Sequence, residues 1–140
     1  MDNNSSFDLN ILTPKGLVLE EKAFFLKLPT SEGEVSILPS HSPSLFQLNV
    51  GECVLSYDKQ DTDAYFFIVR GYAHVTLDKV IVLTPFLEFL KDIDYNRAKK
   101  SEKRAIDRLN SVDNTIDKER AQISLTRAQK RIHLVDYYRN

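Results

Sequence analysis

The sequence is poor in the residues that build covalent or metal-centred sites. Its 140 residues include no tryptophan and a single cysteine, Cys53. One cysteine excludes an internal disulfide and argues against a cysteine-based metal centre. The three histidines, His41, His74 and His133, are scattered along the chain and lack the spacing of metal ligands. We therefore predict no metal site, and Cys53 is expected to be a small core residue.

Long apolar runs and catalytic motifs are missing as well. The longest apolar runs, Tyr65–Val69 and Val80–Leu83, are far shorter than the ~20 residues that a membrane span needs, so direct membrane insertion is not expected. Met1–Ser6 has neither the basic nor the apolar region of a signal peptide. Phosphate-binding loops, GxGxxG, HExxH and CxxC are absent, and we predict no catalytic residue.

Glycine and proline are confined to the first part of the chain, and that part also carries a net negative charge. All four glycines and all five prolines precede Phe86. Up to Glu88 there are six basic and twelve acidic residues, whereas thirteen basic and eight acidic residues follow. Such a break predicts two modules, which we place at residues 1–87 and 88–140.

The first module has the pattern of a β-sandwich. Short apolar or alternating segments recur every 8–12 residues between turn residues, as in sandwiches and barrels. Asp78-Lys79 is expected to form a tight hairpin, and the segment from Pro39 to Pro43 an ordered loop. The predicted strands are Phe7–Thr13, Leu17–Lys22, Phe24–Leu28, Glu34–Leu38, Glu52–Tyr57, Ala64–Val69, Tyr72–Leu77 and Lys79–Leu83.

The second module has the pattern of an antiparallel helical hairpin. Apolar residues recur at helical spacing, with Asp94 and Thr115 as expected N-caps and a turn over Asn110–Asn114. Alanine dominates both apolar stripes, so they bury little area and favour weak packing. The two stripes are Ala98, Ser101, Ala105, Leu109 and Val112, and Ala121, Leu125, Ala128, Ile132 and Val135.

Arginines at helical spacing are the main candidates for chemistry. Arg97 and Arg104 are seven residues apart and Arg127 and Arg131 four apart, so each pair shares a helix face. Folding of the hairpin would bring four guanidinium groups toward one polyphosphate. A solvated basic face with ordinary ion pairs is the alternative that spacing alone leaves open, and a basic hairpin that binds nucleic acid is a further one.

Motifs along nearly the whole chain, residues 7–135, are similar to those of one family. They are Leu12-Thr13-Pro14, Gly33-Glu34, Ile37-Leu38-Pro39 with His41 and Pro43, Arg70-Gly71, Asp92-Ile93-Asp94 with Arg97-Ala98, Arg104-Ala105, Arg120-Ala121, and Arg127-Ala128 with Arg131. In this order the motifs resemble the epsilon subunit of the F-type, proton-driven rotary ATP synthase. Ser36 and Ser40 stand where that family usually has glycine.

The resemblance implies a fold and a role. The expected fold is α+β and mainly β: an N-terminal flattened β-sandwich followed by an antiparallel helical hairpin. The expected role is that of a non-catalytic central-stalk subunit that couples ring rotation to ATP synthesis and inhibits ATP hydrolysis through its C-terminal helices. Its partners would be the gamma subunit, the ring of c subunits and the alpha/beta head, with no nucleic acid. The ring-facing residues would be Glu34, Ser40, His41 and Ser42.

The resemblance also implies a regulatory ligand and a location. No cofactor is required, but some bacterial members hold ATP in the folded hairpin. The matching positions here are Glu88, Asp94, Arg97, Arg104, Arg127 and Arg131. The protein is expected peripherally at the cytoplasmic face of the bacterial inner membrane, with the plastid thylakoid as second choice. A stand-alone ATP-sensing or nucleic-acid-binding hairpin is the alternative function.

Overall fold

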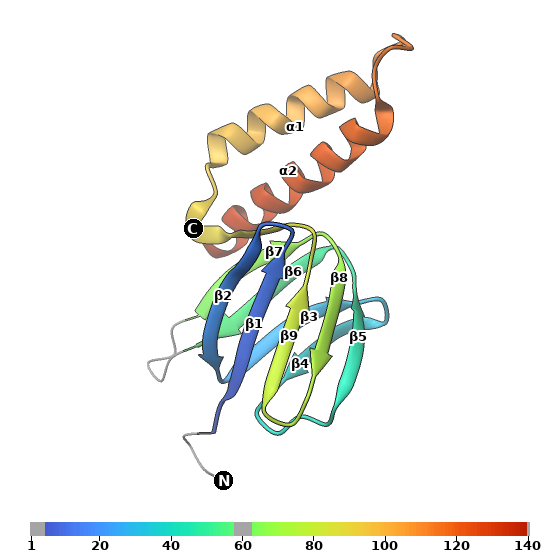
Figure 1. Cartoon of the computed structure of the whole chain (residues 1–140). Coiled ribbons are helices and arrows are strands. Elements are labelled where there is room, and N and C mark those ends of the chain that lie inside the picture. Colours follow the sequence, from blue (N-terminus) through green and yellow to red (C-terminus); the bar gives the residue numbers. More distant parts are fainter. Residues whose placement is uncertain (1–4, 58–62, 140) are drawn as a thin grey trace. The chain divides into compact units, whose positions relative to one another are not determined.

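A computed structural model describes residues 5–57 and 63–139 (Figure 1). The prediction that Met1–Ser6 is not a signal peptide concerns a segment that lies mostly outside these residues. The chain forms two compact units, Met1–Phe89 and Leu90–Asn140. The first unit is built from strands and the second from helices, so the fold class predicted from the sequence is confirmed.

The described residues of the first unit form ten strands. Their order in the sheet is β10-β7-β6-β3-β5-β8-β9-β1-β2, and β4 pairs with β3. The strands are β1 (Phe7–Thr13), β2 (Gly16–Ala23), β3 (Phe25–Thr30), β4 (Gly33–Ile37), β5 (Ser44–Leu48), β6 (Gly51–Ser56), β7 (Asp63–Ile68), β8 (Gly71–Val75), β9 (Lys79–Leu83) and β10 (Leu87–Phe89).

The sheet divides into two halves that share one core. Only Thr30 and Leu48 pair β3 with β5, which join the halves. The alternation seen in the sequence of β1 holds, since Phe7, Leu9 and Ile11 are buried while Asp8 is exposed. The core draws on both halves and includes Leu9, Ile11, Val80 and Val82 from one, and Leu26, Leu28, Leu55 and Phe66 from the other. A sandwich results.

Eight strands were predicted, all at nearly the observed positions, and two were missed. The missed strands are β5 and β10. The latter pairs with β7 through Leu87–Phe89 and extends the sheet unit past the expected boundary at residue 87. The expected hairpin joins β8 and β9, and its turn is closed by Thr76 N–H donating to the Lys79 carbonyl at 2.8 Å.

A short 3₁₀ helix, η1 (Leu90–Asp92), and two α-helices form the second unit. Helices α1 (Tyr95–Leu109) and α2 (Lys118–Tyr138) run antiparallel, side by side (Figure 1). The carboxylate of Asp94 caps α1 by accepting from Arg97 N–H at 3.1 Å, as predicted.

Two details of the hairpin prediction were wrong. The N-cap of α2 is Asp117 rather than Thr115, because the backbone N–H and hydroxyl of Thr115 both bond the Asp113 carboxylate in the preceding turn. Val112 was expected on the apolar stripe of α1, yet it lies beyond the end of that helix and is 97% exposed. Of the other stripe residues, Ser101, Leu109 and Leu125 are partly buried and the rest are buried.

Candidate functional site

An apolar row crosses the outer face of the sheet unit. In register, Gln47 of β5 lies opposite Tyr72 of β8, and Tyr72 opposite Leu83 of β9. Leu12 of β1 pairs with both Leu83 and Leu17 of β2, so all five side chains share one face. Tyr72, Leu83 and Leu17 are each about half exposed, at 52%, 51% and 50%. We call Leu12, Leu17, Tyr72 and Leu83 the apolar row.

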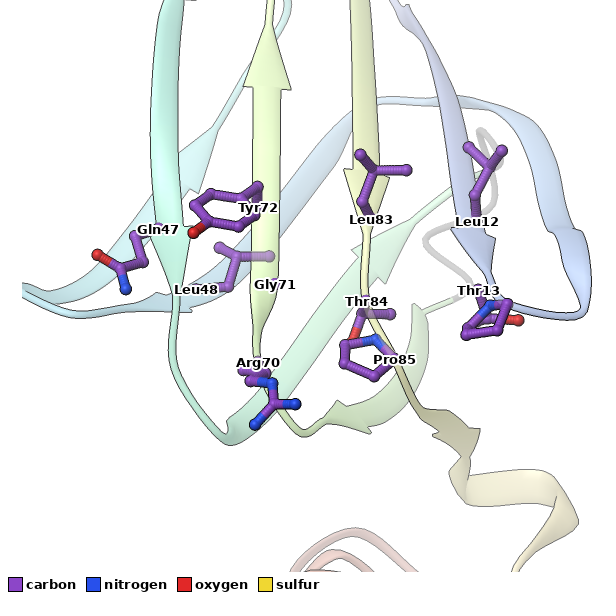
Figure 2. Close-up of a pocket in the computed structure, with 11 residues that line it drawn as sticks. Leu12, Thr13, Gln47, Leu48, Arg70, Gly71, Tyr72, Leu83, Thr84 and Pro85 are labelled. Carbon is purple, nitrogen blue, oxygen red and sulfur yellow. The ribbon is translucent and has the colours of Figure 1, made fainter.

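A hollow of about 530 Å³ adjoins the apolar row. Figure 2 shows Tyr72, Leu83 and Leu12 on neighbouring strands, with Arg70 and Pro85 at the strand ends. Contiguous exposed apolar surface of this kind, rimmed by polar groups, marks contact sites for other molecules. The hollow is lined by Leu12, Thr13, Pro14, Gln47, Leu48, Arg70, Gly71, Tyr72, Leu83, Thr84 and Pro85.

The floor of the hollow depends on a glycine. Gly71 has φ +140°, and a Cβ there would lie 1.9 Å from the Leu83 carbonyl oxygen. The backbones of β8 and β9 therefore meet at a distance that only glycine allows. Beside them, the buried Thr84 hydroxyl donates to the Phe86 carbonyl at 3.1 Å and fixes the exit of β9.

The other end of the same face is charged. Asp8 of β1 pairs with Lys22 of β2 and Lys79 of β9, and Lys22 Nζ donates to Asp8 Oδ1 at 2.8 Å. This hydrogen bond and the opposite charges lower the pKa of Asp8 and raise that of Lys22. The outer face thus changes from apolar to charged along the strands, which gives a partner one orientation.

The predicted ring-facing residues lie on two elements. Ser40, His41 and Ser42 follow β4 in an ordered loop, where His41 N–H donates to the Leu38 carbonyl at 3.1 Å. The His41 ring nitrogen Nδ1 is 2.8 Å from the Ser42 carbonyl oxygen. Ser40 holds φ +64°, a left-handed conformation that favours glycine, in line with its place at a glycine position of the family.

Glu34 lies in β4 rather than in that loop. It sits opposite Pro29 of β3, and its carboxylate is 3.5 Å from Lys27 Nζ. With a rise of about 3.3 Å per residue, the rest of β4 separates Glu34 from the loop by roughly 10 Å. Glu34 is therefore separated along the strand from the other three candidates, and the contact of all four with a ring stays a prediction.

Five of the six proposed ATP-binding residues belong to the helical unit. Arg97 and Arg104 are exposed on α1. Arg104 Nη2 donates a hydrogen bond to Ser101 Oγ at 3.4 Å. Arg127 and Arg131 are partly buried on α2. Asp94 is already engaged as the N-cap of α1.

The sixth residue, Glu88, belongs to the sheet unit, where it pairs with Phe67 across β10 and β7. The complete six-residue site stays a prediction.

Cys53 lies in the core, as the sequence predicts. Cys53 is fully buried in the core, and burial raises the pKa of its thiol well above the ordinary value, so it remains a protonated core residue. Across residues 5–57 and 63–139, no group of three or more His, Cys, Asp or Glu is placed to hold a metal. No helix in the same ranges has the length and apolar character required to cross a membrane.

The apolar row was not predicted from the sequence. Its members lie on two strand pairs, β1–β2 and β8–β9, that are far apart in the chain, and the register of β1 with β9 brings the pairs together. Leu12, Arg70 and Gly71 did stand among the family motifs, which was the one available signal.

Two family models match the chain, one for each unit. Residues 6–89 match the beta-sandwich domain of the ATP synthase delta/epsilon chain, and residues 91–136 match its long alpha-helix domain. The chain is 39% identical over 129 residues to the ATP synthase epsilon chain of Nitratidesulfovibrio vulgaris (strain DP4), with 92% of this chain and 95% of that one covered. It is 35% identical over 130 residues to the ATP synthase epsilon chain of Clostridium novyi, with 93% and 98% covered.

A solved structure shares the fold. A chain in the cryo-EM structure of the Euglena gracilis mitochondrial ATP synthase, comprising OSCP, F1 and c-ring, aligns with a TM-score of 0.74 at 23% identity. The alignment covers 93% of this chain and 82% of the other. A likeness at this identity concerns the fold alone, and the sandwich followed by a helical pair is what the two chains have in common.

Proposed function

Because this chain belongs to the ATP synthase delta/epsilon family, we propose that it is the epsilon subunit of an F-type ATP synthase, non-catalytic by itself. In this role the sheet unit joins the gamma subunit to the ring of c subunits, so that rotation of the ring reaches the alpha/beta head. The helical unit restrains ATP hydrolysis. The subunit sits peripherally at the cytoplasmic face of the bacterial inner membrane, held by its partners.

The observation that carries the proposal is the apolar row. A rotor subunit has to transmit torque without slipping, which requires a broad contact with its neighbour. Half-exposed Tyr72, Leu83 and Leu17 offer apolar area for that contact, and the charged end at Asp8 and Lys22 fixes its direction. We assign this face to the gamma subunit.

Binding to a matching gamma subunit tests this assignment. Burying one leucine or tyrosine side chain contributes about 1.5–3 kcal/mol, so Leu83→Glu or Tyr72→Glu is expected to weaken gamma binding by roughly tenfold or more. Leu77→Glu is the matched control, because Leu77 is 65% exposed but precedes β9, in the turn after β8. Calorimetry of each variant with gamma gives the affinities. Equal affinities for all variants would move the contact elsewhere, and no binding by the unchanged chain would refute the proposed function.

The ordered loop supplies the proposed contact with the ring. Pro39 and Pro43 bracket Ser40–Ser42, and His41 makes polar contacts to the Leu38 and Ser42 carbonyls within the loop. In the assembled enzyme, a cysteine at Ser40 is expected to crosslink to the polar loop of a c subunit. Crosslinks only to the alpha/beta head would contradict this placement.

ATP is the proposed regulatory ligand of the helical unit. Arg97, Arg104, Arg127 and Arg131 provide the positive charge that a triphosphate needs, and ligand binding to the closed hairpin alone stabilises it by about 2.7 kcal/mol at a hundredfold excess over Kd. ATP is therefore expected to raise the melting temperature of the isolated chain. Arg104→Ala or Arg127→Ala should abolish the rise, whereas Lys103→Ala on exposed α1 surface should not. Absence of ATP binding up to millimolar concentration would leave the arginines as protein contacts.

A further inference from the structure

A lysine closes one end of the helical hairpin. Lys118 is the first residue of α2, and its ammonium group donates to the carbonyls of Arg108 at 2.7 Å, Leu109 at 3.0 Å and Ser111. The last carbonyls of a helix have no partner within it and carry its negative dipole end. An ammonium group has three donors, so Lys118 uses all of them on the end of α1 and the residues just after it.

An arginine closes the opposite end. Arg139 is the C-cap of α2, and its guanidinium nitrogen Nη2 donates to the carbonyls of Leu90 and Ile93, the latter at 3.1 Å. Leu90 begins η1, and Ile93 directly precedes the Asp94 N-cap of α1. The end of α2 is thereby fastened to the segment that leads into α1, 46 and 49 residues away in sequence.

Small residues make up much of the seam between these two ends. Ala98, Ala105, Ala121 and Ala128 are at most 2% exposed, so the helix backbones lie close together. An alanine methyl nevertheless buries far less area than a leucine or isoleucine side chain. An isolated helix of 15 residues, the length of α1, is marginal in water. Ile132 and Val135 of α2 are also buried, toward the end of the helix that Arg139 caps, and the hydrogen bonds of Lys118 and Arg139 add to this packing at the two ends.

We propose that Lys118 and Arg139 are two clamps that hold α1 and α2 together, and that release of either clamp opens the whole hairpin. Parting of the helices must break both sets of bonds, since in each the donor lies on α2 and the acceptors lie on or beside α1. The consequence for ATP hydrolysis rests on the proposed function, but the opening itself does not.

Amide hydrogen exchange on the full chain tests the clamps. An opened α1 frays, so its amides report the opening. Loss of charge-assisted hydrogen bonds in Lys118→Met is expected to speed exchange about tenfold, and to do so at Lys99–Ser101, near the far end of α1. Arg139→Met is expected to speed exchange equally at Arg108–Asn110. The two ends of α1 are about 20 Å apart at 1.5 Å per residue.

This reciprocal effect separates a clamp from a local cap. A lysine that only capped α1 would change exchange near Arg108 and leave Lys99–Ser101 unchanged, and that result would overturn the proposal. Lys103→Met is the matched control, because it removes the same charge from an exposed position of α1 and should leave exchange within about twofold of the unchanged chain. If Lys118→Met loses its helices altogether, Lys118→Gln replaces it, since its amide keeps two donors.

ATPase measurements on the reconstituted enzyme test whether opening of the hairpin changes the inhibition of ATP hydrolysis, which is a separate question from whether the clamps hold the helices together. Clamp variants that open more readily are expected to inhibit hydrolysis more strongly than the unchanged chain. Faster exchange at both ends together with unchanged inhibition would uphold the clamps and refute the regulatory part of the proposed function. Exchange within about twofold of the unchanged chain in both clamp variants would refute the clamps themselves, whatever the ATPase result.

Discussion

Substitution of Gly71 by alanine should be among the most damaging single changes in the sheet unit. At φ +140°, an added Cβ would lie 1.9 Å from the Leu83 carbonyl oxygen and 3.0 Å from Thr84 Cα. Ordinary carbon–oxygen contacts lie at about 3.3 Å, so β8 and β9 would have to separate by more than about 1 Å. The separation would occur where Tyr72 pairs with Leu83, and it would weaken the ladder at that end.

The size of the effect follows from two contributions. A non-glycine residue at this φ costs about 1–3 kcal/mol, and each ladder hydrogen bond lost costs about 0.5–1.5 kcal/mol. With the steric displacement, Gly71→Ala is expected to lower the free energy of unfolding by roughly 3–6 kcal/mol. Gly33→Ala is the matched control, because Gly33 has φ +114° and open space around its Cβ position. In Gly33→Ala, only the free-energy cost of the unfavourable backbone conformation remains.

Thermal unfolding followed by far-ultraviolet circular dichroism compares the two variants. For a unit of this size each kcal/mol shifts the Tm by about 4–8 °C, so Gly71→Ala should melt at least roughly 10 °C below Gly33→Ala. Gamma binding should fall as well, since Gly71 lines the hollow beside the apolar row. Equal melting temperatures for the two variants would mean that the close approach of β8 and β9 is not a constraint, and the reasoning would fail.

Three other predictions concern the loop, the turn and the division into units. Ser40→Gly removes a left-handed serine at φ +64° and is expected to raise the free energy of unfolding by about 0.5 kcal/mol, because the relief of about 1–2 kcal/mol exceeds the entropic cost of glycine; an unchanged or lower Tm would count against it. Hydrogen bonds from Thr115 lower the pKa of Asp113, so the turn gains stability above the ordinary carboxyl pKa of about 3.9 and loses it as the pH falls through the lower, folded value. Asp113→Asn should therefore lower the protection factor of the Thr115 amide at pH 7 and abolish the loss of protection that the unchanged chain shows when Asp113 is protonated; equal protection factors in the two chains at pH 7 would contradict this. Truncation after Phe89, which retains the pairing of β10 with β7, should leave a chain that unfolds cooperatively, supports coupling and no longer inhibits; an unfolded product would show that the sheet unit needs the helices.

The strands whose bounds depend on local alternation and on flanking turn residues were predicted correctly from the sequence. β1 and β9 were placed to the residue, because alternation and flanking turn residues mark both ends. β5 was missed, since Leu45 and Gln47 share its outer face and Leu45 is 71% exposed, which breaks the expected separation of apolar and polar sides. β10 has three residues, too few for any periodicity.

Specific hydrogen bonds and contacts between residues far apart in the chain could not be predicted from the sequence. Thr115 and Asp117 are both good N-caps by residue type, and only the hydrogen bonds from Thr115 to Asp113 decide between them. The clamp residues Lys118 and Arg139 look like ordinary charged helix positions, because their acceptors are backbone carbonyls that no sequence pattern records. Register likewise creates the apolar row from residues 5 to 71 positions apart.

Each unit is stabilised internally by a different kind of interaction, and this difference suits the different roles proposed for the two units. The sheet unit buries large side chains such as Phe66, Leu9 and Ile37, whose removal costs about 2–5 kcal/mol each. Among residues 90–139, the helical unit buries four alanines and only a few larger side chains, Ile93, Ile132, Leu134 and Val135. Its ends are closed by hydrogen bonds, and surface polar contacts of that kind contribute only about 0.5–1.5 kcal/mol each. Local opening then requires less free energy in the hairpin than in the sheet. A ligand or partner that contributes a few kcal/mol can therefore shift the hairpin between closed and open states, while the sheet that carries the apolar row keeps its shape throughout.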